Sequence, residues 1–115
     1  MLIKGEGQEK IFFGKNWEIL DYMLPNEDIG ISYQKVNGRV PESGRIKNNV
    51  CREICYITKG KGCFYVENDL FEAKKGDIIM IDTNKKSYIM GKLLEFIVIT
   101  SPNWHESQSE FINND

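Results

Sequence analysis

Two stretches of the sequence decide the fold, Glu53-Ile-Cys-Tyr-Ile-Thr-Lys-Gly60-Lys-Gly62 and Gly76-Asp-Ile-Ile-Met-Ile81. Each is a short apolar run beside glycine, and apolar runs bounded by turn residues are typical of β-strands. The first run ends at its glycines and the second begins at one. We therefore predict that Glu53–Lys59 and Asp77–Ile81 are two strands of a β-barrel.

Short apolar runs and frequent turn signals continue along the chain, which favours an all-β fold. The predicted strands are Glu18–Met23, Ile29–Val36, Arg52–Thr58, Cys63–Val66, Leu70–Ala73, Asp77–Ile81, Tyr88–Met90 and Leu94–Thr100. Residues that tolerate positive φ or hydrogen-bond locally break these runs, at Asn37-Gly38, Gly60-Lys-Gly62, Glu67-Asn-Asp69, Lys75-Gly76, Thr83-Asn84 and Gly91-Lys92. We expect Gly60–Gly62 to form a hairpin, and the only helical candidate is a short turn from His105 to Phe111. The predicted fold is a single-domain jelly-roll β-barrel.

Length and composition narrow the class of protein. The 115 residues have room for one domain, with a core barrel at about 17–104 and loose ends at Gly5-Glu-Gly7 and Asn113-Asn-Asp115. A net charge of -2 gives no reason to expect nucleic acid as a partner. No apolar run approaches the roughly 20 residues that span a bilayer, so we expect no membrane partner and a cytoplasmic protein. The three cysteines form no CxxC pair, which indicates free thiols in a reducing compartment.

The segment from Arg45 to Trp104 resembles a single-domain cupin. The first cupin motif has the form G-x5-H-x-H-x(3,4)-E-x6-G, and Glu53 followed by Gly60 matches its acidic residue and closing glycine. The second motif has the form G-x5-P-x-G-x2-H-x3-N, and Gly76-Asp-Ile-Ile-Met-Ile81 matches its beginning. The resemblance implies a small jelly-roll barrel. It does not choose a function, because the superfamily includes enzymes, sensors and storage proteins.

The resemblance also implies where metal ligands would stand, and the chain lacks most of them. With a three-residue spacer before Glu53 the two histidine positions fall on Lys47 and Asn49, and with a four-residue spacer they fall on Ile46 and Asn48. The proline, glycine, histidine and asparagine positions of the second motif are Asp82, Asn84, Ser87 and Gly91. A transition metal needs about three imidazole, carboxylate or thiolate ligands. We therefore predict no metal and no cofactor.

Strand periodicity suggests what replaces a metal. Alternate residues of a strand share a face, so an extended run from Arg45 to Ile57 would place Lys47, Asn49 and Glu53 on one face. The resemblance puts Glu53 inside the barrel, where an uncompensated charge costs several kcal/mol by order of magnitude. Arg45 or Lys47 could offset this charge in an ion pair.

Two other environments for Glu53 remain open. Its carboxylate could accept hydrogen bonds from neutral groups while Arg45 and Lys47 are solvated. Alternatively Cys51, Glu53 and Cys55 could bind zinc, although alternate strand positions lie about 7 Å apart, which spreads the ligands widely for one tetrahedral ion.

Three functions are consistent with these residues: a binding protein, an enzyme and a structural barrel. The favoured one is a metal-free binding protein that captures a small polar molecule, such as a sugar or a carboxylate. Its cavity would be lined by Arg45, Lys47, Asn49, Glu53, Ser87 and Tyr33. The alternative is a sugar isomerase or epimerase in which Glu53 is the catalytic residue that moves a proton. A non-catalytic structural barrel is the third, so whether the protein is an enzyme is left open.

The remaining apolar residues suggest assembly rather than chemistry. Small cupins usually pair, as the resemblance implies, and Ile11-Phe12-Phe13 lies near the predicted loose N-terminus. We predict a homodimer that involves this segment. Trp17 and Trp104 are expected to pack in the core or an interface, and His105 lies outside the predicted strands.

Overall fold

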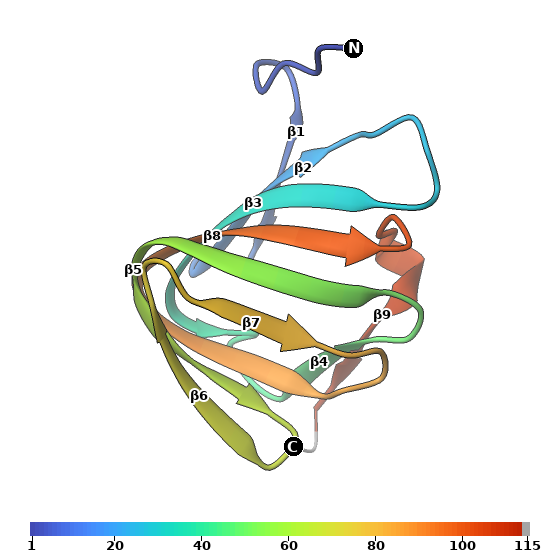
Figure 1. Cartoon of the computed structure of the whole chain (residues 1–115). Helices are drawn as coiled ribbons and strands as arrows, with labels where there is room; N and C mark the ends of the chain where they lie inside the picture. Colours follow the sequence, from blue (N-terminus) through green and yellow to red (C-terminus); the bar gives the residue numbers. More distant parts are fainter. Residues whose placement is uncertain (114–115) are drawn as a thin grey trace.

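The computed structural model describes residues 1–113, and these form a curled antiparallel β-sheet (Figure 1). Its nine strands are β1 Glu9–Phe13, β2 Trp17–Tyr22, β3 Gly30–Val40, β4 Arg45–Asn48, β5 Arg52–Val66, β6 Asp69–Lys74, β7 Ile78–Ile81, β8 Ser87–Ser101 and β9 Ser109–Ile112. A 3-10 helix, η1 Glu106–Gln108, precedes β9. The prediction of an all-β jelly-roll barrel is confirmed. None of the described residues forms a helix that is long and apolar enough to cross a membrane.

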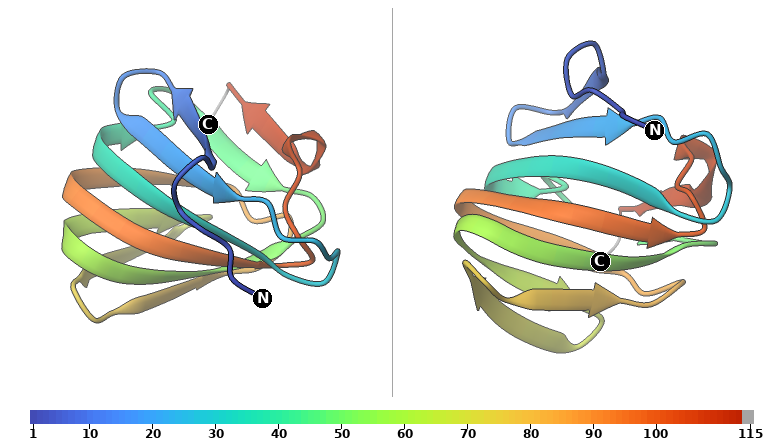
Figure 2. Two further views of the ribbon diagram at one scale, coloured as in Figure 1. Left: turned by 90° about the horizontal axis from the view of Figure 1, so that it is seen from above. Right: turned by 45° about the horizontal axis from the view of Figure 1, so that its top comes forward.

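Strands β5 and β8 organise the sheet, since each is 15 residues long and the two pair along most of their length. Strand β8 also pairs with β3, and β2 and β1 continue the sheet from β3. Strands β7 and β6 pair with successive halves of β5, while β4 joins β8 to β9. The long strands bend, so that the sheet curls around an interior (Figure 2).

Three of the predicted breaks are bends within continuous strands. Strands β3, β5 and β8 pass without interruption through Asn37-Gly38, Gly60–Gly62 and Gly91-Lys92. Gly91 lies opposite Gly38 on one side and Gly62 on the other, so three glycines form a row across the sheet. A Cβ atom on Gly62 would lie 2.9 Å from the carbonyl oxygen of Met90, which is too close for a side chain. The predicted hairpin at Gly60–Gly62 is therefore wrong: glycine permits the strand to bend here rather than to turn back.

The ends of the chain carry strands that the sequence did not predict. Strands β1 and β9 extend the sheet beyond residues 17–104 on both sides. In the segment His105–Phe111, only η1 is helical, and the last three residues of the segment belong to β9. The predicted loose end at 113–115 concerns two residues, 114 and 115, that lie outside the described part of the chain.

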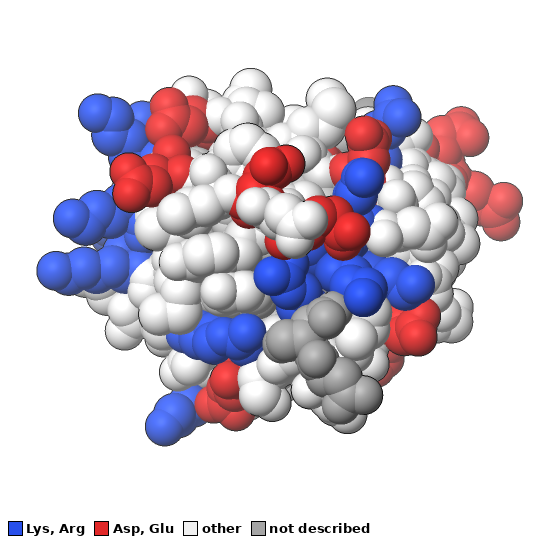
Figure 3. All heavy atoms as spheres, turned by 90° about the horizontal axis from the view of Figure 1, so that it is seen from below, with Lys and Arg blue, Asp and Glu red and all other residues white. Residues whose placement is uncertain are grey.

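The apolar core fills the half of the barrel beside the glycine row. Phe64 and Phe96 are almost completely buried, and their rings meet edge to face with centroids 5.8 Å apart. Ile57 and Leu94 are also fully buried. On the outside, the face drawn in Figure 3 carries basic and acidic side chains with uncharged surface between them. The core therefore fills one half of the barrel.

Candidate functional site

The half of the barrel away from the glycine row contains a partly open cavity of about 260 Å³. Aromatic side chains make much of its wall, namely Phe13, Trp17, Tyr88, Phe96, Trp104 and Phe111. Ten polar residues from several elements also line it, namely Asp21, Ser32, Gln34, Asn48, Glu53, Ser87, Thr100, Asn103, Glu106 and Ser109. Apolar walls with a few convergent polar groups are typical of sites for small molecules.

Glu53 is held in the cavity by the register of the sheet. It lies opposite Ile81 of β7 and Thr100 of β8, and Thr100 lies opposite Gly30 of β3. Because directly opposite residues of an antiparallel pair project to the same face, these residues form one inward-facing row. Glu53 is partly buried, and its side chain lines the cavity.

The carboxyl group of Glu53 has one neutral partner and no cation. Asn48 Nδ2 donates a hydrogen bond of 2.7 Å to Glu53 Oε1. Burial raises the pKa of Glu53 to about 7, and the hydrogen bond from Asn48 offsets only part of this rise. No lysine or arginine is found among the described residues that line the cavity. A carboxyl group with this pKa can both accept and donate a proton near neutral pH.

Two cysteines lie beside Glu53 and are less reactive than ordinary thiols. Burial, followed by the charge of Glu53, raises the pKa of Cys51 to about 12. The same two causes raise the pKa of Cys55, which lines the cavity. Because the thiolate is the reactive form, neither cysteine is poised as a nucleophile at neutral pH.

A hydrogen-bonded chain connects Glu53 to the far wall of the cavity. Asn48 Oδ1 accepts hydrogen bonds from Ser109 Oγ at 2.7 Å and from Trp104 Nε1 at 3.3 Å. Trp104 Nε1 also lies 2.9 Å from Ser109 Oγ. The pairing of β4 with β9 brings Asn48 and Ser109 opposite each other, which makes these contacts possible. The partly buried Trp104 ring is thereby fixed at the cavity.

Thr100 contributes a hydroxyl group that the described residues leave unpaired. The residue is 6% exposed, and its Oγ1 atom has no hydrogen-bond partner among residues 1–113. A Cβ atom on the neighbouring Gly30 would lie 2.6 Å from this oxygen and 2.5 Å from Asn103 Oδ1. Buried polar groups are rarely left without a partner, so the unpaired hydroxyl marks this row as a polar point of the cavity.

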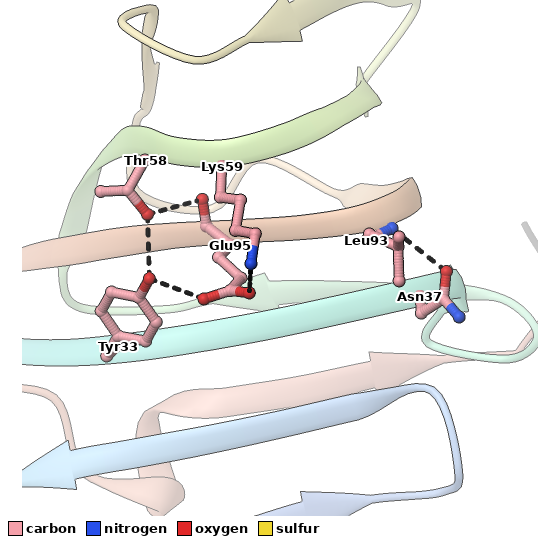
Figure 4. Close-up of polar contacts among 6 residues, drawn as sticks. All are labelled: Tyr33, Asn37, Thr58, Lys59, Leu93 and Glu95. Atoms are coloured by element: carbon pink, nitrogen blue, oxygen red, sulfur yellow. Dashed lines mark hydrogen bonds and ion pairs between the residues drawn. The ribbon is translucent and has the colours of Figure 1, made fainter.

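Two of the residues predicted to bind ligand, Glu53 and Ser87, line the cavity. The other four lie elsewhere. Arg45 Nη1 donates to the carbonyl oxygen of Glu67 at 2.8 Å, and Lys47 Nζ pairs with Glu110 Oε2 at 3.7 Å. Asn49 is exposed. Tyr33 lies on the outer face of the sheet, where its hydroxyl donates to Glu95 Oε1 at 2.8 Å (Figure 4).

The predicted shared face of Lys47, Asn49 and Glu53 is wrong because the chain is not extended throughout. Strand β4 ends at Asn48 and β5 begins at Arg52, and the segment between them is irregular. The alternation therefore changes phase, so that Ile46 and Asn48 line the cavity in place of their odd-numbered neighbours. The ion pair between Glu53 and Arg45 or Lys47 is accordingly not formed, and a neutral amide is the partner of Glu53.

The residues that sequence reasoning missed are Asn48, Trp104, Ser109 and Thr100. A signal existed for Asn48, because the four-residue spacer of the cupin motif puts a histidine position there. Trp104, expected in packing, is also a cavity wall. No local pattern could have brought Ser109 to Asn48, since the two are far apart in sequence.

The residues at the cupin ligand positions do not fit a transition metal. Ile46, Asn48 and Glu53 supply one carboxylate and no imidazole, whereas such a site needs about three strong ligands. Within residues 1–113, no group of three or more His, Cys, Asp or Glu side chains could hold a metal ion. Cys51, Glu53 and Cys55 do not form such a group either.

No protein-family profile and no curated protein matches the sequence. Solved structures match it closely in shape. The nucleoside dehydratase Pac13 has a TM-score of 0.87 at 16% identity, over 98% of this chain and 91% of that chain. A Streptomyces Pac13 variant with uridine has a TM-score of 0.88 at 16% identity, over 98% and 90% of the two chains.

More distant matches share the same architecture. Ectoine synthase from P. lautus has a TM-score of 0.75 at 14% identity, over 97% of this chain and 90% of that chain. KdgF from Halomonas sp. has a TM-score of 0.72 at 11% identity, over 90% and 96%. These proteins have the cupin fold, and this chain has the fold of a small cupin barrel. Identities this low establish the fold and leave the function to be argued from the site.

Proposed function

We propose that the cavity binds a small uncharged molecule of the sugar or nucleoside class, with Glu53 as its hydrogen-bonding anchor. One observation carries this proposal: the carboxyl group of Glu53 faces a cavity with aromatic and aliphatic walls and has a single hydrogen bond from the described residues, donated by Asn48. Binding sites of this kind use apolar walls for affinity and few polar groups for orientation. The second oxygen of Glu53 has no hydrogen bond from any described residue and is available to a ligand.

The charges around the cavity favour an uncharged ligand over a carboxylate. Asp21, Glu53 and Glu106 line the cavity, and Arg45 and Lys47 are engaged outside it. An anion would meet like charges without a compensating cation, and burying such an ion is costly. Of the two ligand classes predicted from the sequence, the geometry therefore supports the sugar.

The comparison with Pac13 supports extending this class to nucleosides. Pac13 is a nucleoside dehydratase of nearly the same fold, and one of its variants is described with uridine. A nucleoside combines a planar base with a hydroxylated sugar. The cavity of this chain likewise combines aromatic walls with hydroxyl and amide groups.

Calorimetric titration with uridine, D-glucose and D-glucuronate tests the proposal. We expect a neutral compound to bind and glucuronate to bind at least ten times more weakly. Glu53→Ala should weaken binding by about ten- to a hundredfold, because a hydrogen bond to a charged group is worth roughly 1.5–3 kcal/mol. The matched control is Glu95→Ala, which removes a carboxylate from the outer face of the same sheet. Preferred binding of glucuronate, or equal effects of the two variants, would contradict the proposal.

A second function is favoured by the pKa of about 7 at Glu53, since a carboxyl group near half-ionisation at neutral pH suits proton transfer. The ionised Glu53 would take a proton from the hydroxyl-bearing carbon beside a substrate carbonyl, and the neutral acid would then deliver this proton to the former carbonyl carbon, while the hydroxyl proton passes to the carbonyl oxygen. This is the chemistry of a sugar isomerase; delivery to the opposite face of the original carbon would be that of an epimerase. Deuterium uptake from D2O by a bound ketose would support it if Glu53→Gln abolishes the uptake and Glu95→Gln does not.

The homodimer stays a prediction. Ile11 and Phe13 pack against the core of their own chain, so Phe12, which is 63% exposed, is the residue of this segment that is free to meet a partner. Light scattering at micromolar concentration would find a dimer in the wild type. Phe12→Ser should shift it towards monomer.

A further inference from the structure

The hydrogen-bonded chain from Trp104 to Glu53 has a direction that its chemistry imposes. The indole Nε1–H of Trp104 can only donate, and its acceptors are Ser109 Oγ at 2.9 Å and Asn48 Oδ1 at 3.3 Å. Ser109 accepts from the indole and donates its own proton to Asn48 Oδ1 at 2.7 Å. Both donors therefore converge on the oxygen of the Asn48 amide.

The opposite orientation of Asn48 is disfavoured by the same contacts. A flipped amide would bring its NH2 group to the indole N–H, so that two donors would face each other within 3.3 Å. It would also turn its carbonyl oxygen towards the Glu53 carboxylate, where two acceptors would repel. Trp104 and Ser109 thus fix the Asn48 NH2 group on Glu53 Oε1, at 2.7 Å.

The fixed amide decides which oxygen of Glu53 exchanges a proton. Since Oε1 accepts from Asn48, the proton of the neutral acid belongs on Oε2, to which no described residue donates a hydrogen bond. We propose that Trp104 is a positioning residue, which acts through Ser109 and Asn48 so that Glu53 presents Oε2 to the cavity as its single exchangeable site. With regard to the ligand this rests on the proposed function: the group that meets Oε2 would accept a hydrogen bond from the neutral acid, as a carbonyl or ether oxygen does.

Other titratable groups face Glu53 without competing for this role. Cys51 and Cys55 flank it on its own part of the chain, and both thiols stay protonated at neutral pH. Asp21 of β2 and Glu106 of η1 line the same cavity. The directly opposite residues on β7 and β8 are Ile81 and Thr100, which carry no titratable group.

The test is a pH titration of Glu53 in the ligand-free protein, in which NMR of the 13C-labelled carboxyl carbon of Glu53 reports its protonation. Trp104→Phe removes the N–H group, so the Asn48 amide can turn its oxygen towards Glu53 and favour the neutral acid. The titration midpoint should then rise by about one pH unit, the equivalent of one hydrogen bond. A larger cavity by itself would admit water and lower the midpoint, so a rise distinguishes positioning from packing.

Three further variants complete the test. Trp17→Phe is the matched control, because it makes the same change at another aromatic wall of the cavity, where the indole donates to Gln34 Oε1 at 2.9 Å and takes no part in the hydrogen bonds of Trp104. The titration midpoint of Glu53 should stay the same or fall in this variant, and it should not rise. Ser109→Ala should raise the midpoint, and Ser109→Thr, which keeps the hydroxyl group, should not. If Trp104→Phe does not fold, these two Ser109 variants test the proposal in its place. An unchanged or lowered midpoint in both Trp104→Phe and Ser109→Ala would overturn the proposal. Absence of ligand binding in calorimetry would instead contradict the proposed function alone.

Discussion

Two glutamates on neighbouring strands, Glu53 of β5 and Glu95 of β8, show how the two faces of one sheet treat the same side chain. Glu95 lies on the outer face, where it accepts a hydrogen bond from Tyr33 and lies 3.8 Å from Lys59 Nζ (Figure 4). Glu53 lies on the inner face and has only the amide of Asn48. The outer carboxylate is compensated, whereas the inner one is not.

The difference teaches that the carboxyl group with fewer hydrogen-bonding and ionic partners, Glu53, marks the site, rather than Glu95. Around Glu95 the polar groups pair with one another, because Tyr33 also lies 3.0 Å from Thr58 Oγ1 and Thr58 donates to the Glu95 carbonyl oxygen at 3.1 Å. Such a closed network leaves little for a ligand. Glu53 keeps an oxygen free in the cavity, and strongly perturbed groups in cavities are the usual functional candidates.

The largest expected effect is that of Glu53→Gln on the free energy of unfolding at alkaline pH. The pKa of Glu53 is raised from 4.5 to about 7, so the folded state holds this proton more tightly than the unfolded state. Its contribution to stability is complete below pH 4.5 and is lost as the pH rises to about 7. The loss is at most about 3 kcal/mol, and water in the cavity reduces it. Glu53→Gln should therefore be more stable than the wild type at pH 8 and nearly equal at pH 4.

Urea denaturation at the two pH values measures this effect, and Glu95→Gln serves as its control on the outer face. If both variants followed the pH profile of the wild type, the inner carboxylate would be as well compensated as the outer one, and the comparison would fail.

A smaller effect is expected when the outer network is opened by Tyr33→Phe. The variant loses the hydrogen bond from the Tyr33 hydroxyl to Glu95 Oε1, which should lower the free energy of unfolding by about 1 kcal/mol. Burial, and secondarily Glu95, raises the pKa of Tyr33. Glu95→Gln should therefore lower the pKa of Tyr33, which is measured by following the titration of the tyrosines by ultraviolet absorbance. Tyr56→Phe, at a tyrosine that is 45% exposed, is the control and should change neither quantity.

The smallest effect belongs to Lys59→Met. The Lys59 side chain is 72% exposed and its distance to Glu95 Oε2 is 3.8 Å, so the ion pair is screened by solvent. Exposed pairs contribute about 0–1 kcal/mol, and we expect less than about 0.5 kcal/mol here, falling with added salt. A loss above about 1.5 kcal/mol in thermal or urea unfolding would mean that Lys59, rather than Tyr33, compensates Glu95.

The sequence predicts the barrel well where local pattern decides the structure. The turns at Glu67-Asn-Asp69 and Lys75-Gly76 end strands as expected, and Glu67 and Gly76 have positive φ. The glycine row could not be recognised as a bend, because a residue without a side chain permits both a turn and a close approach of strands. Only the pairing of β5 with β8 decides between the two.

The site could be predicted in part. The motif spacing indicates Glu53. Its predicted partner is a cation, because the in-and-out alternation of side chains in β5 predicts the face of Lys47 only if it continues unbroken into β4. One irregular segment changes the phase of a strand and moves every side chain to the other face. Trp104 and Ser109 reach Asn48 through the pairing of β4 with β9, which is a long-range contact that no local pattern contains.

The unbroken course of β5 and β8 has a consequence for how the protein opens. Each strand contributes both to the apolar core, at Phe64 and Phe96, and to the cavity, at Glu53 and Thr100. Both halves of the barrel share β5 and β8, so the cavity half cannot unfold as a separate unit while the core half stays folded. Amide protons of β5 near Glu53 and near Phe64 should exchange with solvent in the same cooperative event. Whatever enters the cavity therefore stabilises the entire barrel against unfolding.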